Sequence, residues 1–385
     1  MLYQKILNKL DEQRGLSEEL APISGYKSGQ ALRKALKEQR EFGSFNGLVK
    51  LVQEIFPNEE NQLLSEYALT LDPNKQTARC MLEYAEIYKL PFLRRELVTK
   101  MKDCSNLVSK QWAEIHEIDI NYINGEINYM EALSLISKIN AKSEEIRLLK
   151  EIFKAYCYFD EQLYTSVIDL INPLTIEFSE CTEDFTNSVI KGRCFVLLAE
   201  CNARRGNINV SRKYANDLIN EININIYKAW GNFHMGNSYM FENYTKGNQY
   251  FMKNFTETNQ IPEMIKKITK RSVNFLDNVW KKEPRFLDIN SNHSSDIHEI
   301  AFYYINQEQT TRAIEMLNSE DVEKLNSNQL GFYWYLKGLV SNSLSDFCKS
   351  VSSFKKSGDC FYCELPMIEL KKLNIDDCII EAMVT

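Results

Sequence analysis

The stretch GNINVSRKYANDLI (206–219) decides the fold class, because apolar residues recur at helical spacing directly after a Gly-Asn break. Two later stretches repeat the arrangement: ENYTKGNQYFMKNF (242–255) and QEQTTRAIEML (307–317). In each of them a small or apolar residue opens an amphipathic helix soon after the break. These stretches predict a chain that is built from repeated helix pairs.

The breaks in the helical pattern recur at similar distances. They fall at Asn124-Gly125, Phe159-Asp160, Arg205-Gly206, Glu242-Asn243, Asn306-Gln307 and Asn342-Ser343. The first two are 35 positions apart, and the next two pairs are each 37 positions apart. These distances are close to the tetratricopeptide period of about 34 residues. Such pairs stack into a superhelix with a concave groove, which indicates either a peptide-binding surface or a purely structural scaffold.

Composition excludes several other classes of protein. The chain has 385 residues, of which 44% are hydrophobic and 26% charged, an ordinary globular balance. Only 14 Gly and 8 Pro occur, too few for the many turns of a sandwich or barrel. We see no signal peptide and no apolar stretch of about 20 residues that could cross a membrane. The ten cysteines lack a disulfide framework, which predicts reduced thiols in a cytoplasmic protein.

Charge is distributed unevenly along the chain. The net charge is −7, yet residues 1–50 contain nine Lys/Arg and six Asp/Glu and so carry +3. A positive N-terminal head on an acidic remainder is typical of a protein in which only the head contacts nucleic-acid phosphates. We therefore expect a head at residues 1–50, which includes the start of a linker, and a repeat domain at residues 51–385.

The head has the pattern of a helix-turn-helix unit. Leu16–Ile23 and Ser28–Glu38 read as two helices around a turn at Ser24-Gly25-Tyr26, with Ser28 as the N-cap of the second. The outer face of that second helix is basic and amide-bearing, although any surface helix can show a polar face. Pro22 argues against the assignment, because it removes a backbone donor late in the first helix. The predicted DNA-binding residues are Lys27, Ser28, Gln30, Arg33, Lys34 and Lys37.

Enzyme chemistry is not indicated. The sequence has no glycine-rich phosphate loop, no HExxH and no nucleophile elbow, so we expect neither an enzyme nor a cofactor. His293 and His298 flank Asp296 in what reads as a capping loop rather than a metal site. Cys360-x-x-Cys363 has no second pair at zinc spacing, and we interpret it as two core thiols on one helix.

Long strings of varied composition carry a resemblance that spans nearly the whole chain. They are LSEELAPISGYKSGQALRKAL (16–36), ARCMLEYAE (78–86), DCSNLVSK (103–110), NFLDNVWKKE (274–283), LGFYWYLKGL (330–339) and SVSSFKKSGD (350–359). The sequence resembles the arbitrium peptide receptors of Bacillus phages, which belong to the tetratricopeptide-type peptide-sensing regulators of Gram-positive bacteria.

The resemblance implies a function and a location. The head would bind double-stranded operator DNA in the host bacterial cytosol and activate a gene that restrains lysogeny. A short secreted peptide with an Arg-Gly-Ala-like end would enter the superhelix and switch this activity off. The C-terminal helices would pair two subunits into a homodimer. The segment IDDCIIEAMV (375–384) supplies an apolar face with Ile375, Ile379 and Met383, which could equally be an intramolecular cap.

The resemblance also assigns binding residues. The segments DIHEIAF and KKSGDCF place Glu299 and Asp359 where family receptors hold the peptide's arginine, and a carboxylate pair suits a guanidinium. Asn328 would contact the peptide backbone, and Phe275 would form an apolar wall. The chain departs from the family in the helix matching LLAECNARRGN, where Glu200 and Arg204 stand in place of amide side chains. These two residues are therefore also expected in the peptide site, and the resemblance does not indicate which residues begin the cognate peptide.

Two other classes of function remain open from the sequence. A phosphatase or blocker of a response regulator would use the same repeats on protein partners without a DNA-binding head. A structural adaptor would have no ligand switch. A three-helix bundle with an outward basic face in the first fifty residues favours the DNA-binding regulator, whereas an extended helical hairpin that packs on the repeats favours the phosphatase or blocker.

Overall fold

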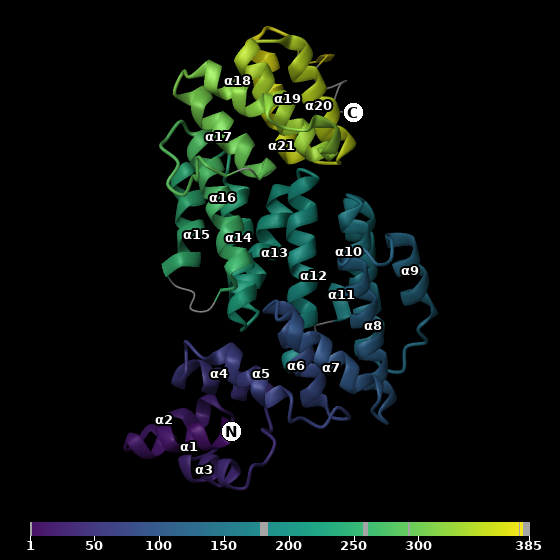
Figure 1. Ribbon diagram of the computed structural model, residues 1–385, viewed down its shortest axis with the longest axis vertical. Helices are drawn as coiled ribbons and strands as arrows, with labels where there is room; N and C mark the ends of the chain where they lie inside the picture. Colours follow the sequence, from purple (N-terminus) through teal and green to yellow (C-terminus); the bar gives the residue numbers. More distant parts are fainter. Residues whose placement is uncertain (1, 178–183, 257–260, 292, 377, 380–385) are drawn as a thin grey trace. The chain divides into compact units, whose positions relative to one another are not determined.

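The computed structural model describes residues 2–177, 184–256, 261–291, 293–376 and 378–379. Across these ranges the regular secondary structure is helical and no β-strand occurs, so the expected all-α fold is confirmed. The helices (Figure 1) are α1 (Leu2–Glu12), α2 (Leu16–Ile23), α3 (Gly29–Lys37), α4 (Phe45–Ile55), α5 (Glu60–Ala68), α6 (Gln76–Ile87), α7 (Pro91–Lys102), α8 (Leu107–Ile123), α9 (Tyr129–Lys138), α10 (Glu144–Asp160), α11 (Tyr164–Glu177), α12 (Phe185–Arg204), α13 (Ile208–Asn220), α14 (Asn225–Ser238), α15 (Tyr244–Thr256), α16 (Glu263–Val279), α17 (Ser294–Asn306), α18 (Thr310–Asn318), the 3-10 helix η2 (Val322–Lys324), α19 (Ser327–Ser341), α20 (Leu344–Lys356) and α21 (Cys360–Lys372).

The described chain divides into two compact units. Unit 1 comprises Met1–Cys157, Pro173–Cys194 and Ile224–Ile226, and unit 2 comprises Tyr158–Asn172, Phe195–Asn223 and Tyr227–Thr385. Helices that follow each other in sequence pack as pairs within a unit, such as α7 with α8 and α19 with α20. This pairing is the arrangement that the repeat spacing predicts. The division into a head of residues 1–50 and a repeat domain of residues 51–385 remains a prediction.

The predicted breaks end helices for identifiable reasons. Each of them lies at the last residues of a helix or between two helices. Gly125 and Gly206 have φ of 74° and 78°, and Asn342 has φ of 50°, the left-handed conformation that stops a helix. Asn326 starts α19 with a capping box, because its side chain accepts from Gln329 while Gln329 accepts from the Asn326 backbone.

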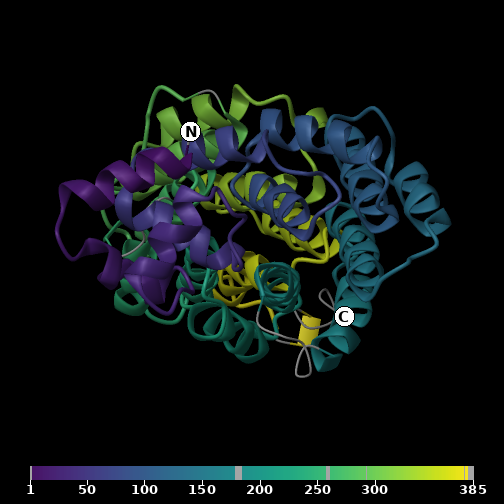
Figure 2. The same cartoon turned by 90° about the horizontal axis from the view of Figure 1, so that it is seen from below.

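The first three helices form a small bundle inside unit 1. Helix α3 packs on α1 and on α2, and Figure 2 shows the three purple helices side by side. The core of this bundle buries Ile6, Leu10, Leu20, Leu32 and Leu36. Pro22 lies in the last turn of α2, on the exposed side, so the helix accommodates it without breaking.

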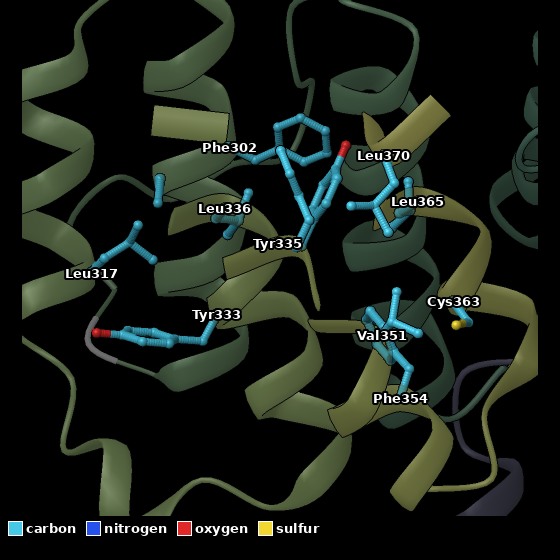
Figure 3. Packing of buried hydrophobic residues seen from close by; sticks show 12 residues of the cluster. Phe302, Leu317, Tyr333, Tyr335, Leu336, Val351, Phe354, Cys363, Leu365 and Leu370 are labelled. Atoms are coloured by element: carbon cyan, nitrogen blue, oxygen red, sulfur yellow. The ribbon is translucent and has the colours of Figure 1, made fainter. Parts of the chain in front are cut away.

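The C-terminal helices of unit 2 enclose a core that positions the site (Figure 3). Its buried side chains include Phe302, Tyr335 and Phe354. Helices α19 and α20 approach so closely at Gly331 that a Cβ there would lie 2.5 Å from the ring of Phe354. Any larger residue at Gly331 would require the Phe354 ring or the helix that carries it to shift.

Two expectations about the C-terminal part need correction or limitation. Cys363 is buried in the core, but Cys360 is exposed at the first position of α21, so only one of the two is a core thiol. Cys360 stands in the first turn of α21, outside the face of the helix that packs on the core. Ile375 packs on the core of unit 2 and Ile379 is exposed, whereas Met383 lies outside the described residues. Among the described helices none has the length and apolar character of a membrane span.

Candidate functional site

A cavity of about 210 Å³ lies within unit 2, between α12, α16, α17, α19 and α21. Four of the predicted peptide-binding residues line it together with several aromatic side chains. They are Arg204, Phe275, Glu299 and Asn328, accompanied by Phe302, Phe332 and Tyr362. Residues that are far apart in sequence therefore meet at one cavity, as the resemblance implies.

The aromatic wall of the cavity centres on Phe275. Its ring lies 5.6 Å from the rings of both Phe332 and Tyr362 and 6.0 Å from that of Phe302, in edge-to-face geometry. Rings that are packed against each other in this way lose little side-chain entropy when a ligand arrives. The cavity thus offers a rigid apolar surface beside a small number of polar groups, the usual composition of a ligand site.

Glu299 is the acid that lines this cavity. Its side chain is only 8% exposed, and its Oε2 has no hydrogen-bond partner among the described residues. Burial raises the pKa of Glu299 well above its ordinary value, although a hydrogen bond from Asn274 and the charge of Arg271 lower it. A buried carboxyl group with an unused oxygen gains free energy when a donor enters the cavity.

Asp359 does not line the cavity, contrary to the expectation that it forms an accessible carboxylate pair with Glu299. Its side chain is fully buried, and Oδ1 caps α21 by accepting from the Tyr362 backbone N–H at 3.1 Å. Its Oδ2 accepts from the Asn328 amide at 2.8 Å and from the Arg204 guanidinium. Asn328 and Arg204 therefore cover Asp359 on the cavity side.

Glu200 and Arg204 form one network with Asp359. Arg204 donates through Nε to Glu200 at 2.7 Å, one helical turn earlier on α12, and through Nη1 to Asp359. Burial would lower the pKa of Arg204, but the charges of Asp359 and Glu200 raise it well above its ordinary value. Glu200 also lies 3.3 Å from Nδ1 of His234. Of the six predicted residues, Glu200 and Asp359 thus contact Arg204 and do not line the cavity.

Arg271 is a cavity residue that the sequence did not single out. Its Nε donates to Asp296 at 2.7 Å, and its Nη2 is buried without a hydrogen-bond partner among the described residues. No spacing pattern in the sequence distinguishes Arg271 from the neighbouring Lys266, Lys267 and Lys270 on the same helix. Its role depends on packing against α17, which sequence periodicity does not specify.

The predicted DNA-binding residues lie on α3 and directly before its first turn. Ser28 caps this helix by accepting from the Ala31 backbone N–H at 3.2 Å, which confirms the expected helix start. The side chains of Lys27, Gln30, Lys34 and Lys37 are exposed. They supply donors and positive charge along one helix, which is what contact with phosphates and base edges requires.

Arg33 differs from the other residues of this face. Its guanidinium pairs with Asp11 and donates to the carbonyl oxygen of Leu10 at 2.5 Å, both on α1. The side chain is half-buried, so it is less accessible than the exposed residues of this face, and its contact with DNA stays a prediction. In this conformation Arg33 instead ties α3 to α1.

Comparison with known proteins identifies a family and relatives to which this chain is similar. Residues 60–372 match the family model described as AimR transcriptional regulator-like. The chain is 29% identical to the AimR transcriptional regulator of Bacillus phage phi3T, covering 96% of this chain and 97% of that protein. It is 28% identical to the AimR transcriptional regulator of Bacillus phage SPbeta, covering 97% of both.

Solved structures agree with the sequence comparison. The fold is similar to the structure of phAimR with selenomethionine, at a TM-score of 0.85 and 28% identity over the whole of both chains. It is also similar to a ligand complex of phAimR, at a TM-score of 0.76 and 29% identity, covering 87% of this chain and 99% of that one. The family model alone spans most of the chain. This chain belongs to the family of AimR-like transcriptional regulators.

Proposed function

We propose that this regulator binds operator DNA through α3 and is switched off by a short arginine-containing peptide that enters the cavity of unit 2. The observation that carries the proposal is Glu299, a buried acid with an unused oxygen on the wall of an aromatic cavity. The active species is a homodimer in the host bacterial cytosol, and the peptide ends in an Arg-Gly-Ala-like sequence. The name of the phage relative as a transcriptional regulator supports the regulatory role, and the ligand complex of phAimR supports a ligand site in this fold.

Chemistry favours a guanidinium as the group that Glu299 receives. A guanidinium is planar, always charged and able to stack on aromatic rings, and here Phe275 and Phe332 flank the same cavity. Asn328 also lines the cavity and offers an amide for the peptide backbone. An arginine residue within a peptide meets both requirements at once.

A titration of the full chain with DNA and peptide tests the proposal. Duplexes selected from random sequence on the purified protein serve as the DNA, and hexapeptides ending in Arg-Gly-Ala serve as ligands. We expect at least one such peptide to lower DNA affinity, and DNA to lower the affinity for that peptide by the same factor, because binding linkage is reciprocal. Peptide binding without DNA binding would instead support a regulator of protein partners.

The exposed lysines of α3 should act through phosphates. We expect Lys34→Ala and Lys37→Ala each to weaken binding to all duplex sequences similarly and to reduce the salt slope by about one. Each loses one positive charge and no base contact. Fluorescence anisotropy at several salt concentrations measures both quantities. Lys138→Ala, an exposed lysine on α9, is the matched control. Unchanged slopes in both α3 variants would exclude α3 from the DNA interface.

Peptide affinity should rise with pH because of Glu299. Burial raises the pKa of Glu299 in the empty cavity, whereas a bound guanidinium favours the charged carboxylate, so binding releases a proton. Affinity should increase by up to about tenfold per pH unit between the ordinary carboxyl range and the raised pKa, then level off. The peptide-free protein should lose stability over the same interval, since its raised pKa favours the neutral acid.

Calorimetry in buffers of different ionisation enthalpy counts the released proton. Glu299→Gln should abolish this proton release, because glutamine does not titrate. A pH-independent affinity in the unaltered protein, with no proton released, would contradict the assignment of Glu299.

A further inference from the structure

Arg204 separates Asp359 from the cavity. The cavity wall includes Arg204 and Asn328 but not Asp359, whose side chain has no exposed surface. The Arg204 side chain is 24% exposed and therefore reachable from solvent, whereas the acid behind it is not. A ligand cation cannot contact Asp359 unless Arg204 moves.

The surroundings of Arg204 resemble a binding site for a guanidinium that is already filled. Two carboxylates, Glu200 and Asp359, accept from its N–H groups, and its guanidinium carbon lies 5.4 Å from the ring centre of Tyr362. Carboxylates in the plane and an aromatic ring against the face are what a free arginine side chain seeks in a protein. Arg204 thus occupies a site whose carboxylates and aromatic ring would also suit the arginine side chain of a ligand.

The two contacts of Arg204 differ in how readily they can separate. Glu200 lies on the same helix at four residues' distance, so this pair can persist in several side-chain conformations. Asp359 lies 155 positions away, at the N-cap of α21, so this contact joins two separate helices. Movement of the guanidinium toward Glu200 would free the place that Arg204 occupies at Asp359, beside the hydrogen bond from Asn328, without leaving Arg204 unpaired.

We propose that Arg204 is an internal competitor, which occupies Asp359 in the peptide-free protein and is displaced by the guanidinium of an incoming arginine residue. This inference rests on the proposed peptide site, in which Arg204 controls access to Asp359. A ligand that carries a guanidinium replaces the contact that it breaks at Asp359, whereas a ligand with a neutral side chain there does not. Arg204 therefore sets both the threshold concentration of the ligand and its selectivity for arginine.

Removing the competitor should tighten binding, the opposite of what loss of a ligand contact would do. If the uncovered state is populated at about one tenth or less, freeing Asp359 should raise affinity for a guanidinium by about tenfold or more. The probes are Nα-acetyl-arginine amide and its neutral isostere Nα-acetyl-citrulline amide, titrated into the full-length protein by calorimetry or NMR without DNA.

We expect Arg204→Ala to bind the arginine probe at least about tenfold more tightly than the unaltered protein and the citrulline probe equally. Arg205→Ala is the matched control, because it removes one exposed positive charge at the next position without uncovering Asp359. Its affinity for both probes should stay within about twofold. The double variant Arg204→Ala/Asp359→Asn should lose the gain, since the acceptor is gone.

The variant itself could fold poorly, because Glu200 and Asp359 lose their shared cation. Arg204→Gln retains an amide donor for Asp359 while removing the charge, so it competes more weakly than arginine and should show a gain in the same direction for the arginine probe. Equal or weaker binding of the arginine probe in both folded variants, including no binding at all, would contradict the proposed displacement of Arg204 from Asp359. A gain that persists in the double variant overturns it as well. Failure of the proposed function would show elsewhere, as DNA binding that no peptide alters.

Discussion

Replacing Glu299 by glutamine should weaken the binding of an arginine-containing peptide by roughly thirtyfold to several thousandfold, which corresponds to about 2–5 kcal/mol. The size of the effect follows from desolvation. The guanidinium leaves water for a cavity whose wall is largely aromatic, and Glu299 is the acid on that wall. Without its charge the guanidinium would be buried beside Arg271 with no carboxylate on the cavity wall itself.

The same substitution should leave the peptide-free protein able to bind DNA. Glutamine preserves the shape of Glu299 and removes a group whose raised pKa already favours the neutral form. The Glu299→Gln variant should therefore remain bound to DNA at peptide concentrations that release the unaltered protein from DNA. Calorimetry with peptide and anisotropy with DNA measure the two properties.

A matched control separates this site effect from a general change in charge. Glu315→Gln removes one exposed carboxylate from α18 in the same unit and should change peptide affinity by less than about twofold. Peptide affinity of Glu299→Gln within the same margin would remove Glu299 from the site. A parallel loss of DNA binding would show that the substitution disturbs the fold.

Local features of this protein are readable from the sequence because short-range interactions determine them. Leu16–Ile23 is helical as expected, and Ser28 caps α3 through a contact only three residues away. Gly206 stops a helix because its backbone adopts a left-handed φ that few other residues tolerate. Helical periodicity and capping thus suffice for the element boundaries and for the all-α fold.

Pairing between distant charges is not readable in the same way. The Arg204 contact with Asp359 spans 155 positions, and the Arg33 contact with Asp11 spans 22. The basic face of α3 and the acidic character of Asp359 are both visible in the sequence, but their partners are not. The resemblance supplied Glu299 and Asp359, and only the contact of Arg204 with Asp359 shows that the second acid is covered.

The second large effect is expected in unit 1, at the buried acid Glu83 on α6. Its carboxylate has no exposed surface and accepts from the Trp112 indole at 2.7 Å. His116 Nε2 lies at 2.8 Å and Arg193 Nη2 at 2.6 Å. Burial would raise the pKa of Glu83, but the charge of Arg193 and the contacts of His116 lower it to about 2. One carboxylate thus connects α6, α8 and α12 at the centre of unit 1.

Glu83→Ala should lower the free energy of unfolding by about 3–5 kcal/mol, because it deletes the buried charge opposite Arg193 and leaves the Trp112 donor unsatisfied. The pH dependence has a definite sign. A carboxylate whose folded pKa is depressed contributes stability above its ordinary value of 4.5, and this contribution is lost as pH falls toward 2. The unaltered protein should therefore lose stability in that interval more steeply than the variant.

Hydrogen exchange of the full chain locates the damage and excludes a global effect. In Glu83→Ala protection should fall in α6 and α8, while arginine-peptide affinity at low temperature stays within about threefold, because Glu83 lies in unit 1 and the cavity in unit 2. Glu117→Ala is the matched control. It removes an exposed carboxylate that pairs with Lys102 on α7, and its cost should stay within about 1 kcal/mol. If Glu83→Ala unfolds no more easily than Glu117→Ala, the buried network does not stabilise unit 1, and the three donors around Glu83 find other partners.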